Sequence, residues 1–116
     1  MREMRPPDAV DLGGGHWFQW ITGDPERYPT DDSRFRDWPG SDGRNLVGII
    51  EGHLRPDGRQ CEGFVSFVRG LSEPERPTWT VLSLDPLRID PSVHCVKEKG
   101  GCGSHGWIHD GRWTDA

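Results

Sequence analysis

Alternating apolar and polar positions run through several short segments of the 116-residue chain and predict β-strands. The clearest are residues 16–22, HWFQWIT, and residues 78–84, TWTVLSL, where successive side chains fall on opposite faces. Residues 45–70 add two β-branched runs around the turn sequence RPDG. Neither a heptad repeat nor a helical period is visible. The pattern predicts a mainly β fold, a small antiparallel sheet or a rolled β-barrel, with long loops.

The RPDG turn sets the register of the hairpin predicted within residues 45–70. Pro suits the second position of a type I turn and Gly its left-handed position, so Arg55 pairs with Arg59. Counting outward places His53 opposite Cys61, with their Cβ atoms about 5 Å apart on one face. That face also carries apolar residues, so a His and a Cys are predicted to lie together in the interior. The apolar residues are Val47, Ile49, Val65 and Phe67.

A second hairpin is predicted near the C-terminus, in residues 105–113, HGWIHDGRW. Asp-Gly between alternating residues is a strong indication of a two-residue hairpin turn. We expect Trp107 to point with His105 toward the core, and Trp113 to lie on the opposite side, open to the N-terminal segment or a partner. The predicted pairs are His109 with Arg112 and Ile108 with Trp113.

Between the first strand and the first hairpin, residues 23–44 are dense in Pro, Asp and Gly, which predicts a long loop. We expect its aromatic residues to fold back over the core: Tyr28, Phe35 and Trp38. A second polar loop, residues 71–77, precedes the strand at 78–84, and an extended segment follows that strand.

The composition predicts a thin core. Apolar residues make up 32% of the chain, and it contains 16 Gly and 10 Pro, so little surface is buried for its length. Either a metal that staples the fold or a partner that completes the core would compensate. The three cysteines are an odd number, and the N-terminus has no signal-peptide core, which favours a cytoplasmic protein with reduced thiols. These thiols are therefore expected to bind a metal rather than form a disulfide.

Cys95, Cys102 and His105 are the candidate metal ligands near the C-terminus. The spacing Cys-x-x-His is that of a ligand pair, and zinc prefers four thiolate and imidazole ligands in a closed tetrahedral site. The fourth ligand is expected from the buried hairpin pair: Cys61 is favoured and His53 is the alternative. The sequence thus predicts a structural zinc that staples residues 16–116 into one domain, preceded by an extended arm at residues 1–15.

Two catalytic alternatives use the same region. A zinc-dependent hydrolase or deaminase-like enzyme would need an open metal position and a general base, for which Glu51 and Glu62 are candidates, although both are expected to face solvent. A cysteine nucleophile, Cys95 or Cys102, with His105 as its base would resemble a cysteine protease. The His-x-Glu and Pro-Cys-x-x-Cys motifs of zinc deaminases are absent, and no third orienting group can be located for the cysteine pair.

The charge and the length of the apolar runs each argue against one class of partner. A net charge of −5 with scattered basic residues argues against nucleic-acid binding, and no apolar run approaches the roughly 20 residues of a membrane span. Most of the tryptophans are expected in the core. Trp38 and Trp113, which fall in loop and terminal positions, are the candidates for binding a protein partner.

The C-terminal third resembles a known but uncharacterised family. WTVLSLDPLRIDPSVHC followed by CGSHGWIHDGRW is similar to small proteins of actinobacteria, other bacteria and their phages, which share L-(T/S)-(L/I)-x-PS, a Cys and CG-x-HG-(F/W)-I-x-x-G-(R/K)-W. The resemblance implies a metal-binding β domain, and some relatives neighbour bacterial ubiquitin-like conjugation genes. The matching residues are Leu87, Ile89, Pro91, Ser92, Cys95, Cys102, Gly103, His105, Gly106, Trp107, Ile108, Gly111, Arg112 and Trp113.

This chain differs from those relatives in two respects. Six residues separate its C-terminal cysteines where relatives usually have two, and it lacks the Cys-rich N-terminal strand of many bacterial members. The phage form fits better. We therefore expect a non-enzymatic, zinc-stabilised β module, phage-encoded, that binds a protein partner as a virion component or a host-targeting accessory protein. It would act in the host cytoplasm or the virion, and an oligomeric assembly is compatible with this role.

Overall fold

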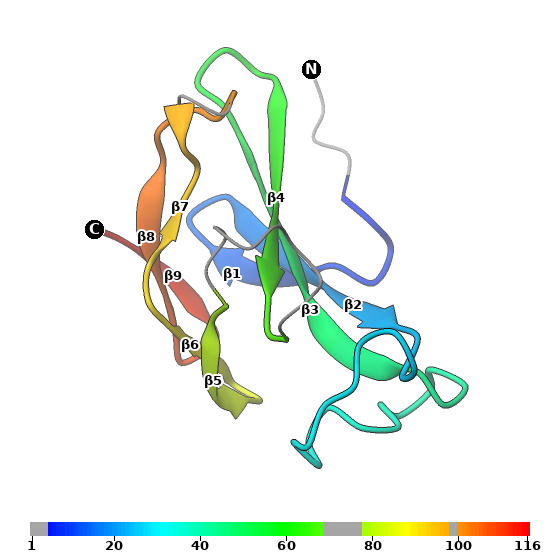
Figure 1. Ribbon diagram of the computed structural model, residues 1–116. Coiled ribbons are helices and arrows are strands. Elements are labelled where there is room, and N and C mark those ends of the chain that lie inside the picture. Colours follow the sequence, from blue (N-terminus) through cyan, green and yellow to red (C-terminus); the bar gives the residue numbers. More distant parts are fainter. Residues whose placement is uncertain (1–4, 69–77, 98–99) are drawn as a thin grey trace.

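A computed structural model describes residues 5–68, 78–97 and 100–116 of the chain. Within these residues the fold is built from β-strands and contains no helix, which confirms the predicted class (Figure 1). The strands form three small antiparallel sheets, and the described residues do not close a barrel. The strands are β1 (Val10–Gly13), β2 (His16–Gly23), β3 (Asn45–Leu54), β4 (Gln60–Ser66), β5 (Thr80–Leu84), β6 (Leu87–Asp90), β7 (Val93–His94), β8 (His105–His109) and β9 (Arg112–Asp115).

The largest sheet has the order β1-β2-β3-β4, so β4 lies at its edge among the described strands. The β3–β4 hairpin has the predicted register: His53 lies opposite Cys61, and Arg55 N donates to Arg59 O over 2.6 Å. Gly58 takes the left-handed conformation, with φ of 86°, that the turn requires. The apolar residues of the inner face are buried as expected: Val47, Ile49, Val65 and Phe67.

The chain after residue 78 forms two further sheets, β5-β6 and β7-β8-β9. The β8–β9 hairpin turns at Asp110-Gly111 and has the predicted pairs, Ile108 with Trp113 and His109 with Arg112. β7 is only two residues long and pairs with the start of β8, which places His94 opposite His105. This short pairing positions the candidate site.

The hydrophobic core lies between the inner face of the four-stranded sheet and the strands that follow residue 78. Ile108 is fully buried there and Trp113 packs against the core cluster, whereas Trp107 is half-buried and outside it. The expectation that Trp107 would face the core and Trp113 would face away was therefore wrong. Gly106 explains the difference, because Trp113 lies directly over it: a Cβ on Gly106 would come within 2.5 Å of the Trp113 ring.

The N-terminal residues and the long loop also contribute to this core. Val10–Gly13 of the predicted arm form β1, and Leu12 is buried. In the loop, Phe35 is buried and stacks near Phe67, with ring centroids 5.8 Å apart, as expected for a side chain folded over the core. Residues 1–4 of the arm and the loop 71–77 lie outside the described residues. No helix long and apolar enough to cross a membrane occurs in the part of the chain that the structure describes.

Candidate metal centre and serine–histidine pair

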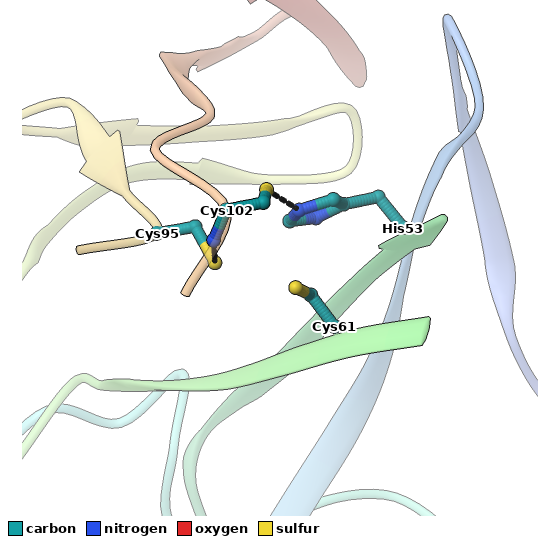
Figure 2. A group of neighbouring side chains, drawn as sticks. All are labelled: His53, Cys61, Cys95 and Cys102. Carbon is teal, nitrogen blue, oxygen red and sulfur yellow. Dashed lines mark hydrogen bonds between the residues drawn. The ribbon is translucent and has the colours of Figure 1, made fainter. Parts of the chain in front are cut away.

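Four side chains with metal-ligand chemistry meet at one end of the four-stranded sheet. His53 comes from β3 and Cys61 from β4, while Cys95 and Cys102 come from the segment between β7 and β8 (Figure 2). The ligand atoms of all four lie within 4.8 Å of one another. Two sulfurs held about 2.3 Å from one zinc ion are about 3.8 Å apart, so the group needs little movement to close around an ion. It could therefore hold a metal.

Local structure prepares the Cys95–Cys102 segment for ligation. The backbone N–H of Cys102 donates to Cys95 Sγ over 3.4 Å, a bond that favours a thiolate. Gly101 allows this close turn, since a Cβ there would lie 2.6 Å from Cys95 Sγ. The base of the loop is held by two backbone bonds, from Cys95 N to Ser104 O and from Gly103 N to Cys95 O, each 2.7 Å long. These bonds bring Cys95 and Cys102 close together.

Arg55 donates a hydrogen bond to a sulfur of the metal-ligand group from the side of the β3–β4 hairpin. Arg55 Nε donates to Cys61 Sγ over 2.8 Å, and the same guanidinium bonds the carbonyl oxygen of Gly100. Arg55 therefore connects the β3–β4 hairpin to the cysteine loop. A cation beside three cysteines also offsets the negative charge that a set of thiolates brings together.

A buried carboxylate orients His53. Glu51 Oε1 accepts from His53 Nδ1 over 2.9 Å and from His16 Nδ1 over 2.5 Å, and all three residues are buried. This leaves His53 Nε2 facing Cys102 Sγ at 3.1 Å. The arrangement is that of a metal-binding histidine whose second nitrogen is held by a carboxylate. The expectation that Glu51 faces solvent was wrong, because Glu51 shares the inner face with His53 and Ile49.

The same contacts shift the protonation of the group. The hydrogen bond to Glu51 raises the pKa of His53 to about 9. Burial would raise the pKa of Cys102, but the hydrogen bonds from His53 and from the backbone of Ser104, together with the charge of His53, outweigh it and the pKa falls to about 7. Burial raises the pKa of Cys95 to about 11. For Glu51, burial opposes ionisation, yet the two histidine hydrogen bonds lower its pKa. The same hydrogen bonds thus favour the charged forms of His53, Cys102 and Glu51.

His105, the predicted partner of Cys102, lies outside this group of described ligands. Its Nε2 lies 2.7 Å from Ser92 Oγ instead. The three predicted cysteines do meet, and their histidine is His53, which the sequence had suggested only as a replacement for Cys61. Strand pairing explains the difference: His105 opens β8 opposite His94, and the β7–β8 pair brings it alongside Ser92, just before β7.

Ser92 and His105 have the geometry of a nucleophile and its base. A serine hydroxyl within about 2.6–3.2 Å of an imidazole nitrogen can pass its proton to that ring. His105 is exposed and Ser92 half-buried, so both are open to a substrate. The ring of His94 lies beside that of His105, with centroids 4.9 Å apart. Trp79 Nε1 donates to the carbonyl oxygen of Ser92 over 3.3 Å and anchors the backbone at Ser92.

A cavity of about 580 Å³ opens at Ser92. Its walls come from β4 on one side and from residues 91–96 and 100–101 on the other, with Trp79 and Arg55 also lining it. The volume lies within the range of about 300–1,000 Å³ that is typical of ligand pockets. Cys61 and Cys95 line the same cavity, so the metal-ligand group and the serine are neighbours.

The candidate partner-binding tryptophans are both engaged within the chain. The Trp38 ring lies 5.3 Å from that of Trp20 and packs against the core. Trp113 stacks on His16, with ring centroids 3.8 Å apart and planes tilted by 8°. Each remains half-buried, and binding of a partner by either side chain stays a prediction.

Sequence reasoning missed Ser92 as a site residue, and it considered Glu51 only as a solvent-facing general base. Ser92 was noted only as part of a shared motif, and His105 was considered as a base for Cys95 or Cys102 rather than for a serine. The PS dipeptide before a short β-run was the one indication available for Ser92. For Glu51, the alternation along the strand, two residues from His53, was sufficient to place it inside.

Comparison with known proteins gives one family match. No curated protein and no solved structure matches the chain. A family model described as "Bacterial ubiquitination-like system serine protease (BubE)" matches residues 56–116. A family described as a protease contradicts the expected non-enzymatic phage module, and that expectation was wrong. The match spans more than half of the chain and includes Ser92, His105 and the three cysteines. The chain belongs to the BubE family.

Proposed function

We propose that the chain is a serine protease that cleaves peptide bonds with Ser92 as nucleophile and His105 as general base. The observation that carries the proposal is the 2.7 Å contact between Ser92 Oγ and His105 Nε2. A serine is a weak nucleophile by itself, and a neighbouring imidazole is the usual means of activating it. The family description, a serine protease, supports the same chemistry.

In the reaction, Ser92 Oγ attacks the carbonyl carbon of the scissile peptide bond while His105 Nε2 accepts the hydroxyl proton. The tetrahedral intermediate then collapses, the C–N bond breaks, and His105 returns the proton to the departing amine. Water next attacks the acyl ester on Ser92, again giving a proton to His105. The ester C–O bond then breaks, His105 returns this proton to Ser92 Oγ, and the carboxylic acid product leaves.

The substrates are proposed to be proteins of a bacterial ubiquitination-like system, in line with the family description. An open site suits a polypeptide substrate: His105 is exposed, and the cavity beside Ser92 is continuous with the surface of β4. The net charge of −5 is also consistent with a protein substrate rather than a nucleic acid.

The metal in this proposal is zinc, and its role is structural. Three cysteines and one histidine are a standard closed zinc set. Because four protein ligands leave no open coordination position, zinc held by all of them would not present a water molecule to a substrate. Bound zinc would tie His53 and Cys61 of the hairpin to the loop that joins Ser92 to His105. Such binding contributes on the order of 10 kcal/mol to the folding of small domains.

Labelling with a small fluorophosphonate tests the proposal directly. The reagent reacts with activated serines, so Ser92 of the wild-type protein should be modified, with the site read by mass spectrometry. Ser92→Ala should abolish labelling. Casein and a bacterial peptide digest serve as general substrates, and Ser92→Ala and His105→Gln should each lower cleavage about 10³-fold or more.

Two matched variants serve as controls. Ser33→Ala removes an exposed serine in the long loop, and His109→Gln removes a histidine from the far end of β8. Both should cleave and label like the wild type. Labelling at another serine, or full cleavage by Ser92→Ala, would show that the 2.7 Å contact is not the catalytic one.

A further inference from the structure

The free edge of β4 runs along the cavity that contains Ser92. Among the strands that the structure describes, β4 pairs only with β3, so its other side is an edge within the described part of the chain (Figure 1). Residues 60–64 of this strand line the cavity, opposite Ser92 and the start of the cysteine loop. Strand edges present rows of backbone donors and acceptors that pair readily with another extended chain.

The register identifies which backbone groups face the cavity. Bonds from Arg55 N to Arg59 O and from Phe67 N to Val47 O bracket the hairpin, and no register shift intervenes. Hydrogen-bonded pairs alternate along an antiparallel ladder, so the odd-numbered residues of β4 bond to β3. The N–H and C=O groups of Glu62 and Phe64 therefore point away from β3. At Ser66 this outward side is already used, because its carbonyl oxygen accepts from Trp79 N over 2.8 Å.

Gly63 leaves a hollow beside this edge. Gly63 lies opposite Glu51, which in turn lies opposite Phe18, so these three residues share the inner face of the sheet. A side chain at position 63 would project from this face toward the cavity. A Cβ at Gly63 would have no atom within 4 Å, and Gly63 is itself exposed. The space is bordered by Trp79, Pro91 and Val96, which give it an apolar wall.

We propose that the substrate binds as an extended polypeptide strand that pairs with the free edge of β4 through the backbone of Glu62 and Phe64, and places an apolar side chain in the hollow over Gly63. This inference rests on the proposed function, because the paired strand would pass beside Ser92. Addition of a strand to a sheet edge is a recurring way of binding peptides, with affinity from the backbone and selectivity from alternate side chains.

Two features of the site support an extended polypeptide rather than a small molecule. Trp79 bonds to Ser66 O and, through Nε1, to Ser92 O, so it fixes the distance between the β4 edge and the nucleophile. At the other end of the cavity, Arg55 bonds Cys61 and Gly100 and closes the gap between hairpin and loop. Between Trp79 and Arg55, the cavity is lined by the backbone of the β4 edge, and the exposed carboxylate of Glu62 lies at its rim.

Two variants of the protein test the hollow. Gly63→Leu projects a side chain into this space, where a Cβ meets no atom within 4 Å, and should raise KM for the best-cleaved peptide of a bacterial proteome digest by roughly tenfold, with a smaller change in kcat. Gly63→Ala should give a smaller rise. Labelling of Ser92 by the small fluorophosphonate should be affected far less, since that reagent does not occupy the strand. Thr114→Leu, which adds the same side chain on exposed β9, is the matched control.

The substrate itself tests the backbone pairing. The same peptide is resynthesised with one N-methyl group at each position in turn. Methylation should impair cleavage at alternate residues, because only every second N–H of a paired strand faces β4. Unchanged KM in Gly63→Leu, or losses without alternation, would overturn the strand model while Ser92-dependent cleavage remains. Absence of Ser92 labelling and cleavage would instead refute the proposed function, and the strand model with it.

Discussion

His94 lies directly opposite His105 in the β7–β8 ladder. The segment between them contains Cys95 and Cys102, and Ser92 comes just before β7. The metal-ligand loop therefore starts and ends at the proposed catalytic pair. A change in the loop should therefore alter the distance between Ser92 and His105.

Loss of a metal ligand should affect stability and cleavage together. The wild-type protein is expected to contain about one zinc ion per chain, measured by elemental analysis. Cys102→Ser should lose the ion and unfold at a much lower temperature, because structural zinc contributes to folding directly. Cleavage and Ser92 labelling should fall as well. Ser104→Ala, two residues away and outside the ligand group, should keep its zinc; a zinc-free wild type with full activity would contradict the prediction.

Removal of the buried carboxylate should weaken metal binding without removing a ligand. Glu51→Gln leaves His53 in place but exchanges the carboxylate that holds its Nδ1 for a neutral amide. Loss of such a supporting group typically lowers metal affinity about 10–100-fold. Competition with a chromophoric chelator measures the change. Glu62→Gln, an exposed carboxylate on the neighbouring strand, should bind zinc like the wild type. Equal affinities for both variants would show that Glu51 does not orient the ligand.

Two glycines of the same sheet should respond oppositely to alanine. Gly52 pairs with Trp17, and a Cβ on Gly52 would lie 2.1 Å from the Trp17 ring, which is fully buried. Gly52→Ala should therefore cost about 1–3 kcal/mol of unfolding free energy or more. Gly63→Ala has open space and should be neutral or slightly stabilising, since alanine loses less backbone entropy than glycine. Denaturant titration of both variants checks this; similar losses would mean that the space over Gly63 is filled.

In the C-terminal hairpin, Trp113 should contribute more to the free energy of unfolding than Trp107. This order is the reverse of the sequence-based expectation. Trp113 covers Gly106, stacks on His16 and packs against the core, so Trp113→Ala should cost about 2–3 kcal/mol. Trp107 lies outside the core cluster, 5.3 Å from the His109 ring, and its replacement should cost clearly less. Thermal melts of the two alanine variants decide the order. A larger loss for Trp107→Ala would support the original assignment of the faces.

Local rules predicted the hairpins and failed where strands from distant segments meet. The RPDG turn determined the partner of Cys61 because register propagates residue by residue from a turn. The Cys-x-x-His spacing, by contrast, suggested His105 as a ligand, since spacing alone does not show that β8 begins at that residue. Ser92 gave no spacing pattern at all. Its relation to His105 depends on a two-residue strand, and no periodicity can be read from so short a run.

The four proposed ligands emerge from the ribosome at two separate stages of synthesis. His53 and Cys61 belong to a hairpin with a local turn and can pair early, whereas Cys95 and Cys102 are made more than thirty residues later. Until then the nascent hairpin has two of the four proposed ligands. Glu51, His16 and His53, which are buried in the complete fold, are not yet covered by the later strands. Ser92 and His105 also belong to this later part of the sequence. The proposed serine–histidine pair could therefore form only after residue 105 has been synthesised, which would spare the proteins around the chain during the earlier part of its synthesis.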